Sequence, residues 1–249
     1  MTAPVEVLNA AGRGRVVLLC EHASNRIPAE YDGLGLSEAD RVSHAAWDPG
    51  ARALTLRLSQ ALDAPVVAST VSRLVYDCNR PPEAASAMPE KSEMIGVPGN
   101  VGLSQQARDA RVAAIYAPFC EAVAQVLYTR GPETVLVTVH SFTPVYFDQP
   151  RAVELGLLHD EDSRLIDAML DHAGRIPHRR IERNEPYGPA DGVTHSLRLH
   201  ALGRGLANVM LEVRNDLLRT DEQVAAMAQD ILALLEPALN EITIKEEAS

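Results

Sequence analysis

The chain has 249 residues, of which 46% are hydrophobic and 23% are charged. This composition is typical of globular proteins and excludes global disorder. The net charge of −11 argues against general binding to nucleic acid or to an anionic membrane, because both need a basic surface. No apolar run approaches the ~20 residues that span a bilayer, and the first ten residues lack the features of a signal peptide. We therefore expect a cytoplasmic protein.

The numbers of cysteines and arginines limit what can be inferred about disulfides and about binding sites. The three cysteines, Cys20, Cys78 and Cys120, are odd in number and far apart in the chain, so no disulfide framework is expected. Cys20 and Cys78 lie in apolar runs, where a thiol is usually inert. Two of the 23 basic residues are lysines, which leaves 21 arginines, so a single arginine is weak evidence for a site.

Short β-branched runs alternate with helical patterns and predict an α/β fold. The predicted strands cover residues 16–20, 65–70, 74–77, 135–140, 152–158 and 208–213. The predicted helices cover residues 50–62, 104–128, 163–173 and 224–239. Asp48 and Pro49 resemble a helix cap followed by the first helical residue, and Thr220 with Gln223 resembles a capping box.

The order of these elements predicts one domain over residues 1–249, with a mixed, mostly parallel sheet between two helical layers. Residues 1–12 and 245–249 are expected to fray. Two segments rich in proline and glycine, residues 80–102 and 184–192, interrupt the pattern. Long loops of this kind in a compact domain are more often functional than idle.

Two histidines lie where predicted strands end: His22 comes shortly after the first strand, and His140 ends the fourth. In open α/β sheets, sites form beyond the carboxyl ends of the strands. A hydrolytic zinc site needs about three protein ligands and one open position for water. We therefore predict that His22 and His140 bind a divalent metal, with zinc expected, although a satisfied structural histidine is the ordinary alternative for either one.

The third ligand is assigned to Asp48, with Asn25 and Glu21 as alternatives. Asp48 has a competing interpretation, because an aspartate before a proline at a helix start is explained by capping alone.

Glu212 follows a buried run, where an unpaired carboxylate is costly. It is the candidate general acid and base, with an ion pair to Arg214 as the alternative. Arg80 with Asn79 is the candidate site for a substrate carboxylate, and Arg73 is a candidate for stabilising the carbonyl oxygen. Structural salt bridges are the alternative for both arginines.

Six stretches in one order resemble the N-formylglutamate amidohydrolase family. They are residues 20–28 (CEHASNRIP), 44–51 (HAAWDPGA), 72–80 (SRLVYDCNR), 139–142 (VHSF), 184–187 (NEPY) and 211–217 (LEVRNDL). The family is in turn similar to the zinc carboxypeptidases, which place a glutamate three residues after the first histidine. Here that position is Asn25. The second ligand of that pattern must therefore change or move, which is why Asp48 is considered.

The resemblance implies zinc and a three-layer, zinc carboxypeptidase-like (phosphorylase/hydrolase-like) fold. It also implies hydrolysis of a small N-acyl amino acid, the type reaction being N-formyl-L-glutamate to formate and L-glutamate in histidine degradation. Residues expected at the substrate, besides Asn79 and Arg80, are Ser24, Asn25, Ser141, Tyr187 and Arg214. Two other functions are considered, a carboxypeptidase-like peptidase and a binding protein that has lost catalysis.

Overall fold

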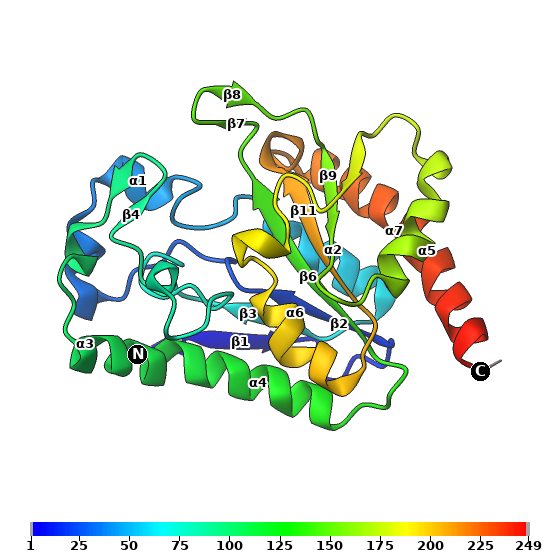
Figure 1. The fold of residues 1–249 in the computed structure, drawn as a ribbon, viewed down its shortest axis with the longest axis horizontal. Coiled ribbons are helices and arrows are strands. Elements are labelled where there is room, and N and C mark those ends of the chain that lie inside the picture. Colours follow the sequence, from blue (N-terminus) through cyan, green and yellow to red (C-terminus); the bar gives the residue numbers. More distant parts are fainter. Residues whose placement is uncertain (1, 248–249) are drawn as a thin grey trace.

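The computed structural model describes the backbone of residues 2–247 and the side chains of residues 2–242. Its centre is a seven-stranded sheet in the order β1-β3-β2-β6-β11-β9-β10 (Figure 1). Four of the six strand pairs are parallel, and the β1–β3 and β11–β9 pairs are antiparallel. The strands are β1 (Val5–Leu8), β2 (Val16–Cys20), β3 (Val66–Ser69), β6 (Val135–Phe142), β9 (Leu155–Leu158), β10 (Ile181–Arg183) and β11 (Asn208–Arg214).

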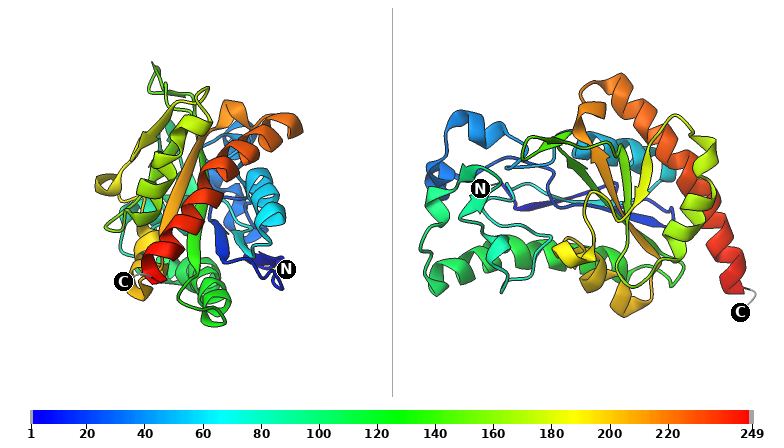
Figure 2. Two further views of the ribbon diagram at one scale, coloured as in Figure 1. Left: turned by 90° about the vertical axis from the view of Figure 1, so that its right-hand side faces the viewer. Right: turned by 45° about the horizontal axis from the view of Figure 1, so that its top comes forward.

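Helices cover both faces of this sheet, as the views in Figure 2 show. One face packs against α2, α5 and α7, and the other against α4 and α6. The helices are α1 (Glu38–Val42), α2 (Ala51–Leu62), α3 (Gln105–Arg111), α4 (Ala117–Tyr128), α5 (Arg164–Asp171), α6 (His195–His200) and α7 (Asp221–Glu247). Because both faces are covered, all five residues of β2 are buried. The predicted three-layer α/β arrangement with a mixed, mostly parallel sheet is confirmed.

Two short hairpins project from the loops at the carboxyl ends of the strands. One pairs β4 (Lys91–Ser92) with β5 (Ile95–Gly96), and the other pairs β7 (Val145–Tyr146) with β8 (Gln149–Pro150). The first hairpin lies within the segment rich in proline and glycine that the sequence singles out.

Several local signals correctly predict where helices start. Ser104 accepts a hydrogen bond from the backbone N–H of Ala107 at the start of α3. Gln223 and Thr220 exchange the two hydrogen bonds of a capping box at the start of α7. The helix predicted over residues 104–128 is interrupted by a π-helical turn, Val112–Tyr116, between α3 and α4.

Two sequence predictions are wrong. Residues 74–77 form turns instead of a strand, because the Ser72 hydroxyl and carbonyl accept the backbone N–H groups of Leu74 and Val75. The N-terminal residues do not fray as a whole, because β1 pairs with β3 along its length. Strand β10 was not predicted. At the other end α7 continues through residues 245–247, and Met1 and residues 248–249 lie outside the described part of the chain.

The segment Gln105–Tyr128 is long and apolar enough to cross a membrane by length and composition alone. In the fold it packs against the sheet and contributes Phe119, Val123 and Leu127 to the core beneath it. A helix that covers a sheet commonly has this composition.

Candidate metal centre

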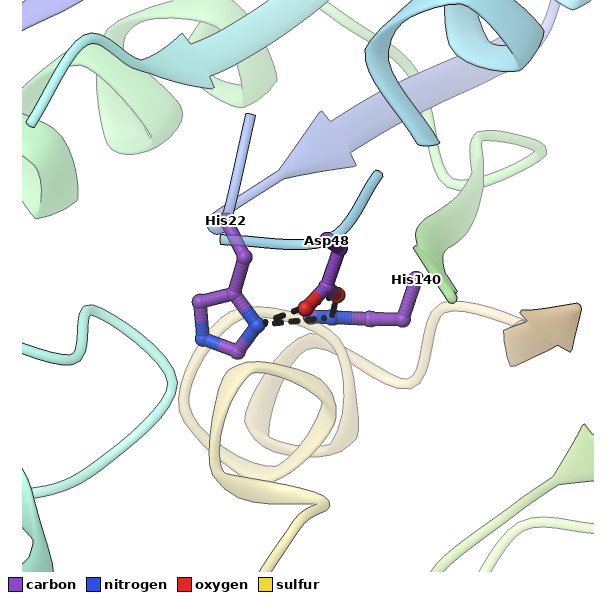
Figure 3. Close-up of side chains that lie close together, drawn as sticks. All are labelled: His22, Asp48 and His140. Atoms are coloured by element: carbon purple, nitrogen blue, oxygen red, sulfur yellow. Dashed lines mark hydrogen bonds and ion pairs between the residues drawn. The ribbon is translucent and has the colours of Figure 1, made fainter. Parts of the chain in front are cut away.

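The two predicted histidines and Asp48 meet at the carboxyl ends of β2 and β6. Figure 3 shows the three side chains pointing toward one another. The Nδ1 atoms of His22 and His140 lie 3.1 Å apart. Oδ2 of Asp48 lies 3.2 Å from the first of these nitrogens and 2.9 Å from the second. All three side chains are buried. They form a group of donor atoms that could hold one metal ion.

A second carboxylate lies behind each histidine. Nε2 of His22 is 2.7 Å from Oδ1 of Asp77, and Nε2 of His140 is 3.2 Å from Oε2 of Glu21. A neutral imidazole carries one N–H. When each ring directs that N–H toward the carboxylate behind it, both Nδ1 lone pairs face Asp48. Three acceptor atoms then lie within 3.2 Å of one another, an arrangement that a cation or a proton must stabilise.

The pKa values show the same demand for positive charge. Burial alone lowers the pKa of His140, but the carboxylates of Glu21 and Asp48 outweigh it and raise that pKa well above its ordinary value. Burial raises the pKa of Asp48, and the two histidines more than reverse this, so the carboxylate stays ionised. Two imidazole nitrogens and a carboxylate oxygen are donors that zinc accepts. The residues therefore fit a divalent metal.

The backbone around Asp48 explains why its carboxylate points into the cluster and does not cap a helix. Helix α2 begins after Gly50, whose φ of +82° is a left-handed conformation. A Cβ atom at Gly50 would lie 2.3 Å from Cβ of Leu218, so the turn also needs the missing side chain. The Asp48 carboxylate accepts the backbone N–H of Ser141, which ties it to β6. The capping interpretation of Asp48 is therefore wrong.

Glu212 lies beside this group because its strand pairs with β6. The parallel register places Glu212 opposite His140. Burial raises the pKa of Glu212 to about 7. Asp48 and Glu212 thus have pKa values shifted in opposite directions, a pattern typical of sites that use one carboxylate as a ligand or stabiliser and another as acid and base.

Gly156 brings a distant loop over Glu212. It lies opposite Glu212 on the neighbouring strand β9. A Cβ atom at this position would lie 1.9 Å from the carbonyl oxygen of Glu185, so only glycine permits this approach. The loop that contains Glu185 places Tyr187 in the same cavity as Glu212.

Arg73 joins the cluster through two carboxylates. Its Nη2 lies 2.8 Å from Asp77, and its Nη1 lies 3.4 Å from Asp48. The Arg73 side chain is 29% exposed and lines the same cavity as the three candidate ligands. One guanidinium therefore bridges a predicted ligand and the carboxylate behind His22.

A cavity of about 500 Å³ opens over these residues, which is the size of a small-molecule site. Of the predicted site residues, it is lined by His22, Asp48, Arg73, Asn79, Arg80, His140, Ser141, Tyr187 and Glu212. The fold thus brings together nine side chains from six separate segments of the chain.

Three predicted substrate residues do not line this cavity. Ser24 accepts a hydrogen bond from the backbone of Arg26, and Asn25 donates to the carbonyl of Arg41. Asn25 is therefore not part of the group of candidate metal ligands. Arg214 pairs with Asp216 instead of Glu212, and it donates to the backbone carbonyl of Arg151. These three side chains therefore form contacts within the surrounding protein and do not reach the cavity.

Asn79 lines the cavity, but its side-chain amide already forms hydrogen bonds within the protein. Its Nδ2 donates to the carbonyl of Val193, and its Oδ1 accepts the backbone N–H of Ser196. Arg80 donates to the carbonyls of Gly192 and Asn79. Among the described residues, no carboxylate forms an ion pair with Arg80.

Sequence reasoning missed Asp77, Arg151 and the pair His44–Glu93. Asp77 and His44 lie inside stretches that carry the family resemblance, which is the one signal that could have drawn attention to them. Nε2 of His44 is 2.7 Å from Glu93 at the cavity mouth. Arg151 carries no sequence signal in a chain with so many arginines.

The cysteines do not take part in the site. Cys20, Cys78 and Cys120 are free, and burial raises the pKa of each thiol. A buried thiol with a raised pKa is a poor nucleophile.

Comparisons with known proteins point to one family. The family model of N-formylglutamate amidohydrolase matches residues 14–219. A solved structure of a gene product from Agrobacterium tumefaciens is 51% identical, with a TM-score of 0.95 and 97% of each chain covered. The N-formylglutamate amidohydrolase of Ralstonia eutropha is 18% identical, with a TM-score of 0.68 over 95% of this chain and 97% of that one, and shows a shared fold. No curated protein matches.

Proposed function

The chain belongs to the N-formylglutamate amidohydrolase family, and on this premise we propose that it hydrolyses the amide bond of a small N-acyl amino acid of the N-formyl-L-glutamate type, with a bound divalent metal. One observation carries the proposal. Two histidine Nδ1 atoms and an aspartate oxygen converge beside a buried glutamate, at the base of a cavity of small-molecule size. Hydrolysis of an unactivated amide needs an activated water and a proton carrier, and these residues can supply both.

His22, Asp48 and His140 would hold the metal, which we propose is zinc. A divalent cation in this position supplies Lewis acidity, which lowers the pKa of water and polarises a carbonyl group. Glu21 and Asp77 would hold the two imidazole rings in the tautomer that leaves Nδ1 free.

Glu212 would remove a proton from the attacking water and return it to the leaving amine. A pKa of about 7 suits both halves of this task, because the group can accept and release a proton near neutral pH. Arg73 would stabilise the negative charge that develops on the carbonyl oxygen. Its guanidinium is held in place by Asp48 and Asp77 before the substrate arrives, so little reorganisation is needed.

Arg80 would bind the α-carboxylate of the substrate. Asn79 supports this by fixing the segment that includes Val193 and Ser196. Ser141 and Tyr187 would line the remaining wall of the pocket. We also propose that the protein works in the cytoplasm as one domain, with a small anionic substrate and without nucleic acid or membrane partners.

The test combines metal analysis with an activity assay. Protein purified without chelators and without a His-tag is expected to contain about one zinc per chain. It should release formate from N-formyl-L-glutamate. His22→Ala and His140→Ala should each lose the metal and the activity. His44→Ala is the matched control, because His44 lines the same cavity outside the ligand group, and it should keep the metal.

Two results would overturn the proposal. The first is a wild-type protein that neither contains nor binds a divalent metal. The second is a metal-loaded protein that cleaves dipeptides but no N-formyl or other N-acyl amino acid, which would favour a peptidase.

A further inference from the structure

Two of the arginines on the cavity wall form no ion pair with any described side chain. Three arginines line the cavity: Arg73, Arg80 and Arg151. Arg73 is paired with two carboxylates. Among the side chains of residues 2–242, no carboxylate lies within ion-pair distance of either Arg80 or Arg151. The pocket thus offers two guanidinium groups that form no ion pair within this part of the chain.

Arg151 follows β8 directly, and its main chain is held at both ends. Its backbone N–H donates to the carbonyl of Pro144, and its own carbonyl accepts from Arg214. Arg214 is in turn fixed by Asp216. The backbone from which the Arg151 side chain enters the cavity is therefore well supported.

Aromatic rings surround the Arg151 guanidinium. Its central carbon lies 4.3 Å from the ring centre of Tyr146, 4.8 Å from that of Tyr187 and 5.5 Å from that of Phe142. These distances are in the range of favourable cation–π contacts. The rings restrict the guanidinium, and among the described residues Tyr187 alone of the three also accepts one of its hydrogen bonds.

Most of the hydrogen-bonding capacity of this guanidinium remains unused. A guanidinium has five N–H donors. Within the described part of the chain, Arg151 makes one side-chain hydrogen bond, from Nη1 to the hydroxyl of Tyr187 at 2.9 Å. A planar fork with free in-plane donors is the group that binds a carboxylate through two parallel hydrogen bonds.

Arg151 also lies close to the reacting region through Tyr187. The charge of Glu212 raises the pKa of the Tyr187 phenol, in addition to the larger effect of burial, and the charge of Arg151 lowers it. Arg151, Tyr187 and Glu212 also line the same cavity, and Arg151 donates a hydrogen bond to the Tyr187 hydroxyl. A group bound by Arg151 would belong to the same small molecule that reacts beside Glu212.

We propose that Arg151 binds the side-chain carboxylate of the substrate and so selects N-acyl derivatives of dicarboxylic amino acids. The inference rests on the proposed function, in which Arg80 binds the α-carboxylate. Two unpaired guanidinium groups in one cavity match the two carboxylates of such a substrate. A neutral side chain would leave Arg151 without a partner, and this loss gives the pocket its preference.

The test compares two substrates that differ only in charge. The values of kcat/KM for N-formyl-L-glutamate and N-formyl-L-glutamine are measured with zinc-loaded wild type, Arg151→Met, Arg151→Lys and Arg180→Met. Arg180 is an exposed arginine paired with Glu182 and serves as the matched control. Wild type and Arg180→Met should prefer the glutamate substrate by at least about tenfold.

Arg151→Met should lose this preference, while its kcat/KM for the glutamine substrate stays within about threefold of wild type. Arg151→Lys should keep part of the preference, because it retains the charge but not the planar fork. A preference that survives in Arg151→Met would overturn the assignment. An equal loss on both substrates would also overturn it, because that result describes a merely structural side chain.

A binding experiment distinguishes failure of this inference from failure of the proposed function. Calorimetric titration of the same four proteins with L-glutamate and L-glutamine needs no turnover. If wild type hydrolyses neither substrate, the proposed function fails. Arg151 is still supported when wild type binds L-glutamate at least about tenfold more tightly than L-glutamine and Arg151→Met does not. Equal binding of the two amino acids by wild type would overturn the assignment.

Discussion

The floor and the rim of the cavity are built in different ways. On the floor, His22, Asp48, His140 and Glu212 are at most 6% exposed, and the first three pair with one another or with carboxylates behind them. His140 and Glu212 lie on the adjacent parallel strands β6 and β11, and His22 lies just beyond the end of β2. Asp48 is tied to β6 because its carboxylate accepts the backbone N–H of Ser141.

On the rim, the side chains come from loops and hairpins. Tyr187 belongs to the loop that passes over Gly156, and Arg151 follows a two-stranded hairpin. On the rim, the Arg151 guanidinium keeps N–H donors that form no hydrogen bond within the described part of the chain. A site that places its chemistry on strands and its selectivity on loops can change substrates without moving its reacting groups. Substitutions on the floor and on the rim would test this division.

Glu212→Gln should have the largest effect. The substitution preserves the size of the side chain and removes its ability to take a proton from water. We expect kcat/KM for N-formyl-L-glutamate to fall by about 10²–10⁴-fold, with the metal content unchanged. Steady-state kinetics with elemental analysis of the same samples would check this. A fall of less than about threefold in metal-loaded protein would contradict the acid and base role.

The same substitution should stabilise the metal-free protein in a pH-dependent way. Burial raises the pKa of Glu212 to about 7 from an ordinary value of 4.5, so the folded protein binds this proton more tightly than the unfolded chain. Below the ordinary value the carboxyl is neutral in both states, and its contribution to stability is fully present. As the pH rises through about 7, the folded protein must carry a buried charge and this contribution is lost.

Above about pH 7, the free energy of unfolding should therefore be raised in Glu212→Gln relative to wild type. The difference between the two proteins should be up to about 3 kcal/mol larger there than at acidic pH. Urea unfolding in the presence of a chelator, at about pH 5 and about pH 8.5, measures it. The idea of a raised pKa fails if the difference between the two proteins is the same at both pH values.

Asp77→Asn tests whether the floor depends on the carboxylates behind its ligands. Its Oδ1 lies 2.7 Å from Nε2 of His22. We expect zinc to bind about 10–100-fold more weakly, as measured by competition with a chelating dye. Glu93→Gln is the control, because Glu93 pairs with His44, which lies outside the ligand group. Equal affinities for Asp77→Asn and wild type would show that this carboxylate does not hold the ring.

Tyr187→Phe should have the smallest effect and should be confined to the rim. The ring that contacts Arg151 remains, and only the hydroxyl that accepts its hydrogen bond is lost. We expect KM for N-formyl-L-glutamate to rise about two- to tenfold with little change in kcat. The glutamine substrate serves as the internal control. A large fall in kcat instead would place Tyr187 in the chemistry of the floor.

Much of the floor could be predicted because its signals are local. The strand at residues 16–20 is recognisable from its β-branched, apolar residues, and His22 follows it directly. The strands around His140 and Glu212 have the same character, and parallel strands bring their carboxyl ends to one edge. Asp48 could be considered as a ligand, but its competing role as a cap could be rejected only from the fold.

Other parts could not be predicted because their partners are distant in the chain. Residues 74–77 have the composition of a strand, and only the folded chain brings Asp77 behind His22. Strand β1 is short, and its pairing with β3 joins segments about sixty residues apart. The contact of Arg151 with the ring and hydroxyl of Tyr187 likewise joins two remote segments.

The sequence by itself determined the α/β class, most of the strands and helix starts, the donor residues and the family resemblance. These depend on neighbouring residues, whose propensities and hydrogen bonds act within a few positions. Only the tertiary structure decided that the Nδ1 atoms face the centre, that the pKa of Glu212 is raised and that Arg151 keeps free donors. Burial and electrostatic potential at one atom are sums over groups from remote segments, and they exist only once the chain has folded around that atom.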